Sequence, residues 1–435
     1  MSSGMPSYDR VCFPLADPQR RLLDRLGACA DPSAYVSFLA HHVRGPLDLP
    51  RLRRAVDALT ARHEPLRTAF PADEDGTVRR QCVEEPDAMP WELTVFDTPP
   101  VPAGPPLPRS DEDTLLRNFA RRPFDLVRGP LARVLVVRRA AEDHLVVLAV
   151  HLLAADGWSL RILLDELGEY YADAGRATAL LPPLAIQYAD WAHWQAGRAA
   201  RPESPLPRIP ARPADGPGRR LRTAPVPVPA AGRLARQERV PLFTVLLTAF
   251  VLAARGPAAS RVLVDVPVSG RDHPQLGVLA GYFIRLHRLD VSLPDAITFR
   301  QAVRRVQGAW AEAEETDAAS SRLAHPPTGT GPAGDPAPAA GGVPLFSYRA
   351  RDVQPRLRLE GCSVTEAPWL HDAAKVDLGL ITDRVGDAVH PVLEFRPSVV
   401  PERAADRLGR SFAVLLDKAA ADPDETVDPL AAGAP

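Results

Sequence analysis

Apolar residues recur at helical spacing in some segments and gather in short strand-like runs in others, and both patterns occur in each half of the chain. Residues 49–62 place apolar side chains on one helical face, which predicts an amphipathic helix. Residues 131–137 and 144–150 are β-rich runs separated by a polar turn, which predicts adjacent antiparallel strands. A further helix is expected over residues 159–172, after a short loop.

The same reading applied to the rest of the chain gives an alternating series of elements. Helices are expected at 17–26, 241–254, 298–315 and 401–421, and strands at 34–43, 261–268, 345–349, 376–383 and 389–395. Strands precede helices in both halves, so an α+β protein with two lobes is predicted.

One segment near the middle of the chain has the composition of a linker. Residues 201–231 are crowded with Pro, Gly and Arg, which disfavours regular structure. The chain is therefore divided into an N-terminal lobe at 1–200, a linker at 201–231 and a C-terminal lobe at 232–435.

Charge and hydropathy exclude several classes of partner. The formal net charge is −2 and there is no long basic block, so no nucleic-acid partner is expected. The longest apolar runs are too short or too broken to cross a bilayer, and no signal peptide is recognisable. These features predict a cytoplasmic protein that does not bind a membrane.

The four cysteines are scattered and include no Cys-x-x-Cys pair. Reduced thiols are therefore expected, with neither a zinc site nor a disulfide framework. The sequence also lacks a metal-ligand cluster and a Gly-rich phosphate loop, so no metal and no cofactor of its own are expected.

Several short motifs follow one another in a fixed order. They are Phe13-Pro-Leu-Ala-Asp-Pro-Gln19-Arg-Arg21-Leu22, Arg62-His63-Glu64-Pro-Leu66-Arg67-Thr68-Ala-Phe70, Pro123-Phe124-Asp125-Leu126, Asp156-Gly157-Trp158-Ser159, Tyr188-Ala-Asp190-Trp191-Ala-His-Trp194, and Val266-Pro267-Val268-Ser-Gly270-Arg271 through Gly281-Tyr-Phe283. Their order resembles that of the condensation domains of nonribosomal peptide synthetases, over roughly residues 10 to 425.

This resemblance implies an architecture and a set of partners. It implies two chloramphenicol-acetyltransferase-like lobes in a V shape with a central tunnel. It implies an acyl- or peptidyl-carrier protein as partner, with phosphopantetheine borne by that partner. A small-molecule amine or alcohol would be the acceptor.

The active-site motif of the family reads His-His-x-x-x-Asp-Gly, and its second His accepts the proton of the nucleophile. Here the stretch is His151-Leu152-Leu153-Ala154-Ala155-Asp156-Gly157, so Leu152 occupies the catalytic position. Consecutive residues at a strand end point to opposite faces, so His151 is expected to be a buried structural residue. The alternative is a loop shifted by one residue that delivers His151 to the tunnel.

Other residues take their expected roles from the resemblance. Asp156 would be structural, Gly157 would let the backbone approach the substrate, and Arg288 would anchor Asp156 once a gap of about two residues is allowed. Arg67 would add structural support. The candidates for the tunnel wall are Trp158, Ser159, Arg285 and His371, the last also as a replacement base.

Two functions are left open by these observations. The first is a stand-alone acyltransferase that forms an amide or ester from a carrier-tethered acyl thioester. Positioned acid–base catalysis is worth about 10²–10⁴-fold, whereas alignment of two reactants contributes roughly 7–11 kcal/mol. The second is a catalytically silent condensation fold that binds a carrier protein and recruits a tailoring enzyme.

Overall fold

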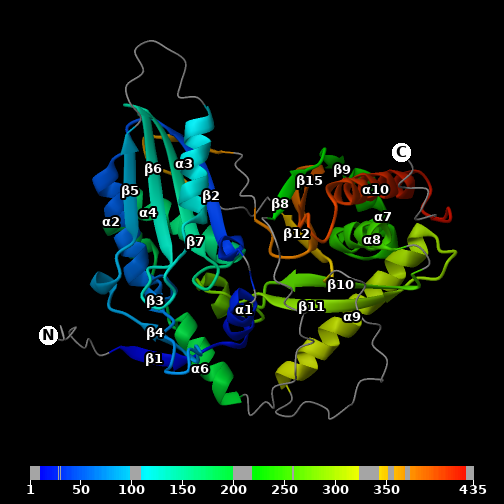
Figure 1. Ribbon diagram of the computed structural model, residues 1–435, viewed down its shortest axis with the longest axis horizontal. Coiled ribbons are helices and arrows are strands. Elements are labelled where there is room, and N and C mark those ends of the chain that lie inside the picture. The colour runs from blue at the N-terminus through cyan, green and yellow to red at the C-terminus, as the bar shows by residue number, and fades with distance from the viewer. Residues whose placement is uncertain are drawn as a thin grey trace.

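The computed structural model of the chain describes residues 10–27, 29, 31–97, 109–198, 218–256, 259–322, 342–350, 357–367 and 373–427. These residues form two lobes, each built on its own mixed β-sheet and each with its own apolar core (Figure 1). The α+β, two-lobed architecture is the predicted one, whereas the central tunnel stays a prediction.

The N-terminal lobe is built on a five-stranded sheet in the order β13–β2–β7–β6–β5. Its strands are β2 (Val36–Arg44), β5 (Glu92–Asp97), β6 (Ala132–Ala140), β7 (Asp143–His151) and β13 (Ser363–Glu366). The central β7 pairs antiparallel with β6, as the sequence predicts, and also with β2. The loop from His151 to α4 therefore begins at the central strand of this sheet.

Helices α2 (Leu49–Arg62) and α4 (Gly157–Ala172) pack against each other over this sheet. Their apolar faces, with Val56, Leu59 and Leu163 at 2% exposure or less, form the core of the lobe. The remaining helices of the lobe are α1 (Asp17–Gly27), α3 (Arg109–Arg121), α5 (Ala174–Leu180) and α6 (Tyr188–Arg198).

Strand β13 comes from the second half of the sequence but pairs with the N-terminal sheet. It runs antiparallel to β2, with Val364 opposite Val43. Just beyond this pairing, the backbone at Gly45 lies close to the backbone at Gly361. Gly45 adopts a φ of 120°, and an added Cβ would lie 2.7 Å from the Gly361 carbonyl oxygen. The C-terminal half of the chain therefore contributes a strand, β13, to the sheet of the N-terminal lobe.

The C-terminal lobe has a sheet in the order β11–β10–β12–β14–β15–β8, with β9 also paired to β15. The strands are β8 (Arg219–Arg222), β9 (Val226–Pro227), β10 (Arg261–Val268), β11 (Arg285–Ser292), β12 (Leu345–Ala350), β14 (Leu378–Val385) and β15 (Ala388–Phe395).

Four helices accompany this second sheet. They are α7 (Pro229–Glu238), α8 (Leu242–Ala254), α9 (Phe299–Arg322) and α10 (Glu402–Ala421). Figure 1 places α7, α8 and α10 on the side of the sheet that faces away from the N-terminal lobe. The opposite face of the sheet is turned toward the N-terminal lobe.

The predicted linker overlaps structured residues. Residues 199–217 lie outside the described part of the chain, but β8, β9 and the start of α7 occupy 219–231. Strand β8 pairs with β15, with Leu221 opposite Leu393. Residues 219–231 of the predicted linker are therefore part of the C-terminal sheet and of the helical layer that covers it.

A small sheet at the base of the N-terminal lobe corrects the prediction for the cysteines. It consists of β1 (Val11–Pro14), β4 (Arg80–Val83) and β3 (Thr68–Ala69). Cys12 and Cys82 face each other in the β1–β4 register and form a disulfide. Sequence spacing could not indicate this pair, because only the strand register brings the two residues together. Cys29 and Cys362 are free.

Among the described residues, no single helix is long and apolar enough to cross a membrane. Helices α7 and α8 together would reach the length, but they are bent by 106° at their junction. Nine of the residues of α8 are buried in the core of the lobe, which accounts for its apolar sequence.

The disulfide yields a first prediction. Because it closes a chain separation of 70 residues, Cys12→Ser is expected to lower the free energy of unfolding by about 2–4 kcal/mol. The measurement is urea denaturation without reductant, with Cys29→Ser as the control. Thiol titration of the unfolded, unreduced protein should find two of the four cysteines reactive; four reactive thiols would contradict the pairing.

Candidate functional site

The loop between β7 and α4 is packed into the N-terminal lobe. The Leu152 N–H donates to the Tyr35 carbonyl oxygen at 2.9 Å, and the Ala154 N–H donates to the His151 carbonyl oxygen at 2.9 Å. The Leu152 side chain is 6% exposed and belongs to the same apolar cluster as Tyr35 and Tyr282. The position where the family motif has its proton acceptor is therefore filled by a buried aliphatic side chain.

His151 is held in one orientation beside this leucine. Its ring is 3% exposed and meets the edge of the Phe124 ring, with centroids 6.0 Å apart. Its Nδ1 accepts the Leu153 N–H at 3.2 Å, so the neutral ring carries its proton on Nε2. Burial lowers the pKa of His151 to about 3. Neither ring nitrogen then has a lone pair available to take a proton from a substrate.

Asp156 begins α4 and binds groups from both lobes. As the N-cap residue it accepts the Ser159 N–H at 2.8 Å through Oδ1. From the other half of the chain, Arg271 donates to the same oxygen at 2.9 Å, and the Phe283 N–H donates to Oδ2 at 3.2 Å. The side chains of Asp156 and Arg271 are 2% and 3% exposed. The pair is thus a fully buried interlobe ion pair.

Ser159 connects the same pair to the chain that crosses from the second lobe. Its Oγ accepts from Arg271 at 2.8 Å and from the Gly281 N–H at 3.0 Å. It also lies 2.7 Å from Asp156 Oδ1 and 2.8 Å from the Gly281 carbonyl oxygen. Ser159, a candidate for the tunnel wall, is therefore buried among the hydrogen bonds that hold the loop in place.

The partner of Asp156 is Arg271, and the prediction of Arg288 is wrong. Arg288 instead forms a two-bond ion pair with Asp265, at 2.8 and 2.9 Å, across β11 and β10. Arg271 ends the motif that begins at Val266, and its contact with Asp156 depends on the turn at Gly270. That glycine has a φ of 63°, and an added Cβ would lie 2.0 Å from the Phe283 carbonyl oxygen.

Aromatic packing fixes the crossing segment against α6. The Phe283 ring lies 4.0 Å from the Arg271 guanidinium carbon, 4.8 Å from the Tyr188 ring and 4.7 Å from the Trp191 ring. The Tyr188 hydroxyl donates to the Tyr282 carbonyl oxygen at 2.6 Å. Two of the sequence motifs therefore meet at this contact.

The other candidate residues are dispersed. Trp158 is 40% exposed, donates to the Gly277 carbonyl oxygen at 2.9 Å, and stacks under Arg161. Arg285 pairs with Asp272 at 3.6 Å. Arg67 donates to the Glu84 carbonyl oxygen and so ties two segments of the lobe together. His371 lies outside the described residues.

Charged residues line the face of the C-terminal sheet that lies opposite α7, α8 and α10. Successive strand registers align Arg288, Asp265, Leu345, Gly379, Glu394 and Arg220 in one row across the sheet. Glu394 accepts from Arg220 at 2.9 Å and from the Lys375 N–H. Burial lowers the pKa of Lys375 to about 8. The interlobe face is therefore polar. Only the strand register brings these charged residues together, so the local sequence pattern could not indicate them.

The buried pair generates a second prediction. Arg271→Ala leaves Asp156 charged and unpaired in the interior, so the free energy of unfolding should fall by about 3–5 kcal/mol. The matched control is Arg285→Ala, because its partner Asp272 is 60% exposed and such pairs contribute about 1 kcal/mol or less. Chemical denaturation measures both, and equal losses would contradict the assigned role of Arg271.

His151 generates a third prediction. Its folded-state pKa is about 3 instead of 6.5, so the unfolded chain binds the proton first as the pH falls. The contribution of His151 to stability is complete above pH 6.5 and is lost progressively toward pH 3, by up to about 1.4 kcal/mol per pH unit. Unfolding of His151→Gln should therefore depend less on pH in this window than that of the wild type. The exposed His193→Gln serves as control, and parallel curves for wild type and His151→Gln would contradict the burial.

Comparison with known proteins is consistent with this architecture. A family model described as Condensation domain matches residues 11–204. Phosphinothricin tripeptide synthetase PhsC of Streptomyces viridochromogenes is 31% identical over 451 residues, which cover 94% of this chain and 39% of the relative. Nonribosomal peptide synthetase kk1B of Curvularia clavata is 32% identical over 317 residues, which cover 66% of this chain and 2% of the relative. The chain thus spans well under half the length of the curated relatives it matches.

Solved structures share the fold over nearly the whole chain. The X-domain from teicoplanin biosynthesis superposes with a TM-score of 0.74 at 21% identity, covering 98% of both chains. The X-domain in a complex with OxyB from the same biosynthesis gives a TM-score of 0.72 at 23% identity, covering 97% of this chain and 96% of that chain. With the ordered motifs and the interlobe ion pair, these similarities establish that the chain belongs to the condensation-domain family of nonribosomal peptide synthetases.

Proposed function

We propose that this chain is a condensation fold without condensation chemistry, which binds a carrier protein in the cytoplasm and recruits a tailoring enzyme to the carrier-bound substrate. The observation that carries this proposal is the buried Leu152 at the position of the proton acceptor, beside a buried His151 whose Nδ1 already accepts the Leu153 N–H.

The chemistry of the family explains why this observation matters. When an amine attacks an acyl thioester, a nitrogen–carbon bond forms, the carbon–sulfur bond breaks, and the nitrogen must give up a proton. A positioned base accelerates such a step by about 10²–10⁴-fold. Leu152 has no lone pair, and a histidine with a pKa near 3 in an apolar setting is a very weak base.

The residues that support the fold, in contrast, are all in place. Asp156, Ser159 and Arg271 hold the loop to the crossing segment, and Phe283 locks that segment against α6. A fold that keeps its interlobe support but has no proton acceptor is better suited to binding than to turnover. The solved complex of an X-domain with OxyB lends support, because there a fold of this kind holds a second protein.

The polar interlobe face is compatible with the expected cargo. Arg349, whose side chain is 53% exposed, is held by Asp383 through bonds of 2.6 and 2.9 Å, and Arg288 is held by Asp265. Oriented guanidinium groups suit a polar acyl or peptidyl group better than a plain hydrocarbon. The phosphopantetheine arm would arrive on the carrier, so the chain needs no cofactor of its own.

An active acyltransferase is the second candidate, and the intact Asp156–Arg271 pair favours it. This pair keeps the loop in place, and alignment of two reactants alone can supply roughly 7–11 kcal/mol. The donor would be a carrier-tethered acyl thioester, and a small amine or alcohol would give an amide or ester.

A fourth prediction separates the two candidates. With acyl thioesters of N-acetylcysteamine and a panel of amines and alcohols, the wild type should form product no faster than the uncatalysed reaction, as followed by mass spectrometry. Leu152→His should gain turnover because it supplies the missing base, whereas Leu152→Met, which is similar in volume, should not.

Carrier binding is the second arm of this experiment. Acyl-loaded holo-carrier proteins should bind the wild type and Leu152→Met alike in biolayer interferometry. Saturable product formation by the wild type, retained in Leu152→Met, would establish the acyltransferase instead. Failure to bind any carrier in the panel would count against both candidates.

A further inference from the structure

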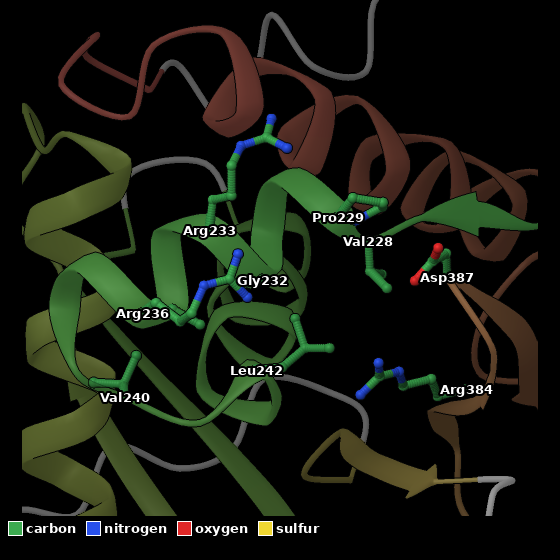
Figure 2. Close-up of a pocket in the computed structure, with 10 residues that line it drawn as sticks. Val228, Pro229, Gly232, Arg233, Arg236, Val240, Leu242, Arg384 and Asp387 are labelled. Carbon is green, nitrogen blue, oxygen red and sulfur yellow. The ribbon is translucent and has the colours of Figure 1, made fainter.

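A hollow of about 440 Å³ lies on the C-terminal lobe, on the helix-covered side of its sheet and away from the interlobe loop. It is bounded by α7, by the start of α8 and by the turn between β14 and β15 (Figure 2). Its volume is within the range of pockets that hold small organic ligands.

The charged lining of the hollow is mainly cationic. Arg233, Arg236 and Arg384 contribute three guanidinium groups, against the single carboxylate of Asp387. Figure 2 shows the Arg236 and Arg384 side chains directed into the hollow from opposite walls, whereas Arg233 points away from it. Positive charges that converge on one space repel each other unless an anion lies between them.

Within the described part of the chain, no ion pair neutralises these arginines. Arg384 donates to the Gly386 carbonyl oxygen at 3.1 Å, in its own turn. Arg300 of the same lobe, in contrast, pairs with both Glu238 and Asp424. The charge in the hollow is therefore available to an external ligand.

The remainder of the lining is apolar. Val228, Val240 and Leu242 supply aliphatic surface, and Figure 2 places Leu242 between the two converging arginines. Gly232 also lines the hollow, and an added Cβ there would be 3.7 Å from Arg236 Nη1. The helix starts at Pro229 and Leu242 add the positive ends of two helix dipoles.

We infer that this hollow binds an organic oxyanion with an apolar body, either a carboxylate or a phosphate monoester. The oxyanion would lie between Arg236 and Arg384, and the apolar body would lie on Leu242 and Val228. This site is separate from the interlobe loop, and the inference does not depend on the proposed function.

The test is isothermal titration calorimetry with four probes. Octanoate and octyl phosphate combine an oxyanion with an apolar chain, inorganic phosphate has the oxyanion alone, and 1-octanol has the chain alone. One of the first two should bind in a single site and more tightly than the last two, and their order tells which oxyanion is preferred.

Variants locate the binding. Arg236→Gln with Arg384→Gln should weaken the preferred probe about ten-fold or more, because two charge-assisted hydrogen bonds are lost. Gly232→Leu should abolish binding by filling the hollow, and it favours the helix, so folding is retained. Arg117→Gln with Arg121→Gln, on α3 of the other lobe, removes the same charge and should leave binding unchanged.

Two results would overturn the inference. The first is the absence of saturable binding by both chain-bearing anions. The second is equal affinity in the wild type and in the Arg236→Gln, Arg384→Gln variant, since binding would then occur elsewhere or without the arginines.

Discussion

The architecture depends on one buried ion pair, between Asp156 at the start of α4 and Arg271 in the segment that crosses from the second lobe. Through Asp156 and Ser159, the pair fixes the start of the helix, the loop before it and the backbone of Gly281 and Phe283. Two charges removed from water are tolerated only with such complete hydrogen bonding. The contact between the lobes and the shape of the site loop are consequently set by the same few atoms.

This arrangement explains how the chemistry can change while the fold persists. The proton acceptor of the family motif is one residue beyond β7 and takes no part in the hydrogen bonds of the ion pair. Leu152 adds apolar contact with the cluster that contains Tyr35 and Tyr282, and its burial is favourable. An aliphatic residue at this position therefore removes no contact that joins the lobes. Replacement of Arg271, in contrast, would remove the ion pair with Asp156.

The sequence predicted elements well and partners poorly, for one physical reason. Residues 49–62 and 261–268 form the expected helix and strand, because local periodicity reports which face is buried. Arg288 was assigned to Asp156 by alignment, yet its partner is Asp265, because the strand register decides. The Cys12–Cys82 disulfide and the pairing of β8 at the end of the predicted linker were missed for the same reason. Contacts between residues distant in sequence leave no local pattern.

Arginine supplies nearly all the positive charge of this chain, since lysine occurs only at Lys375 and Lys418. On the interlobe face several guanidinium groups have a carboxylate partner, as in Arg220–Glu394 and Arg349–Asp383. Those arginines are held by the protein itself and shape a surface without adding net charge to it. Arg236 and Arg384, on the helix-covered side, have no such partner among the described residues. The same residue type thus stabilises one face of the lobe through ion pairs, whereas at the hollow on the other side Arg236 and Arg384 leave positive charge open to a ligand.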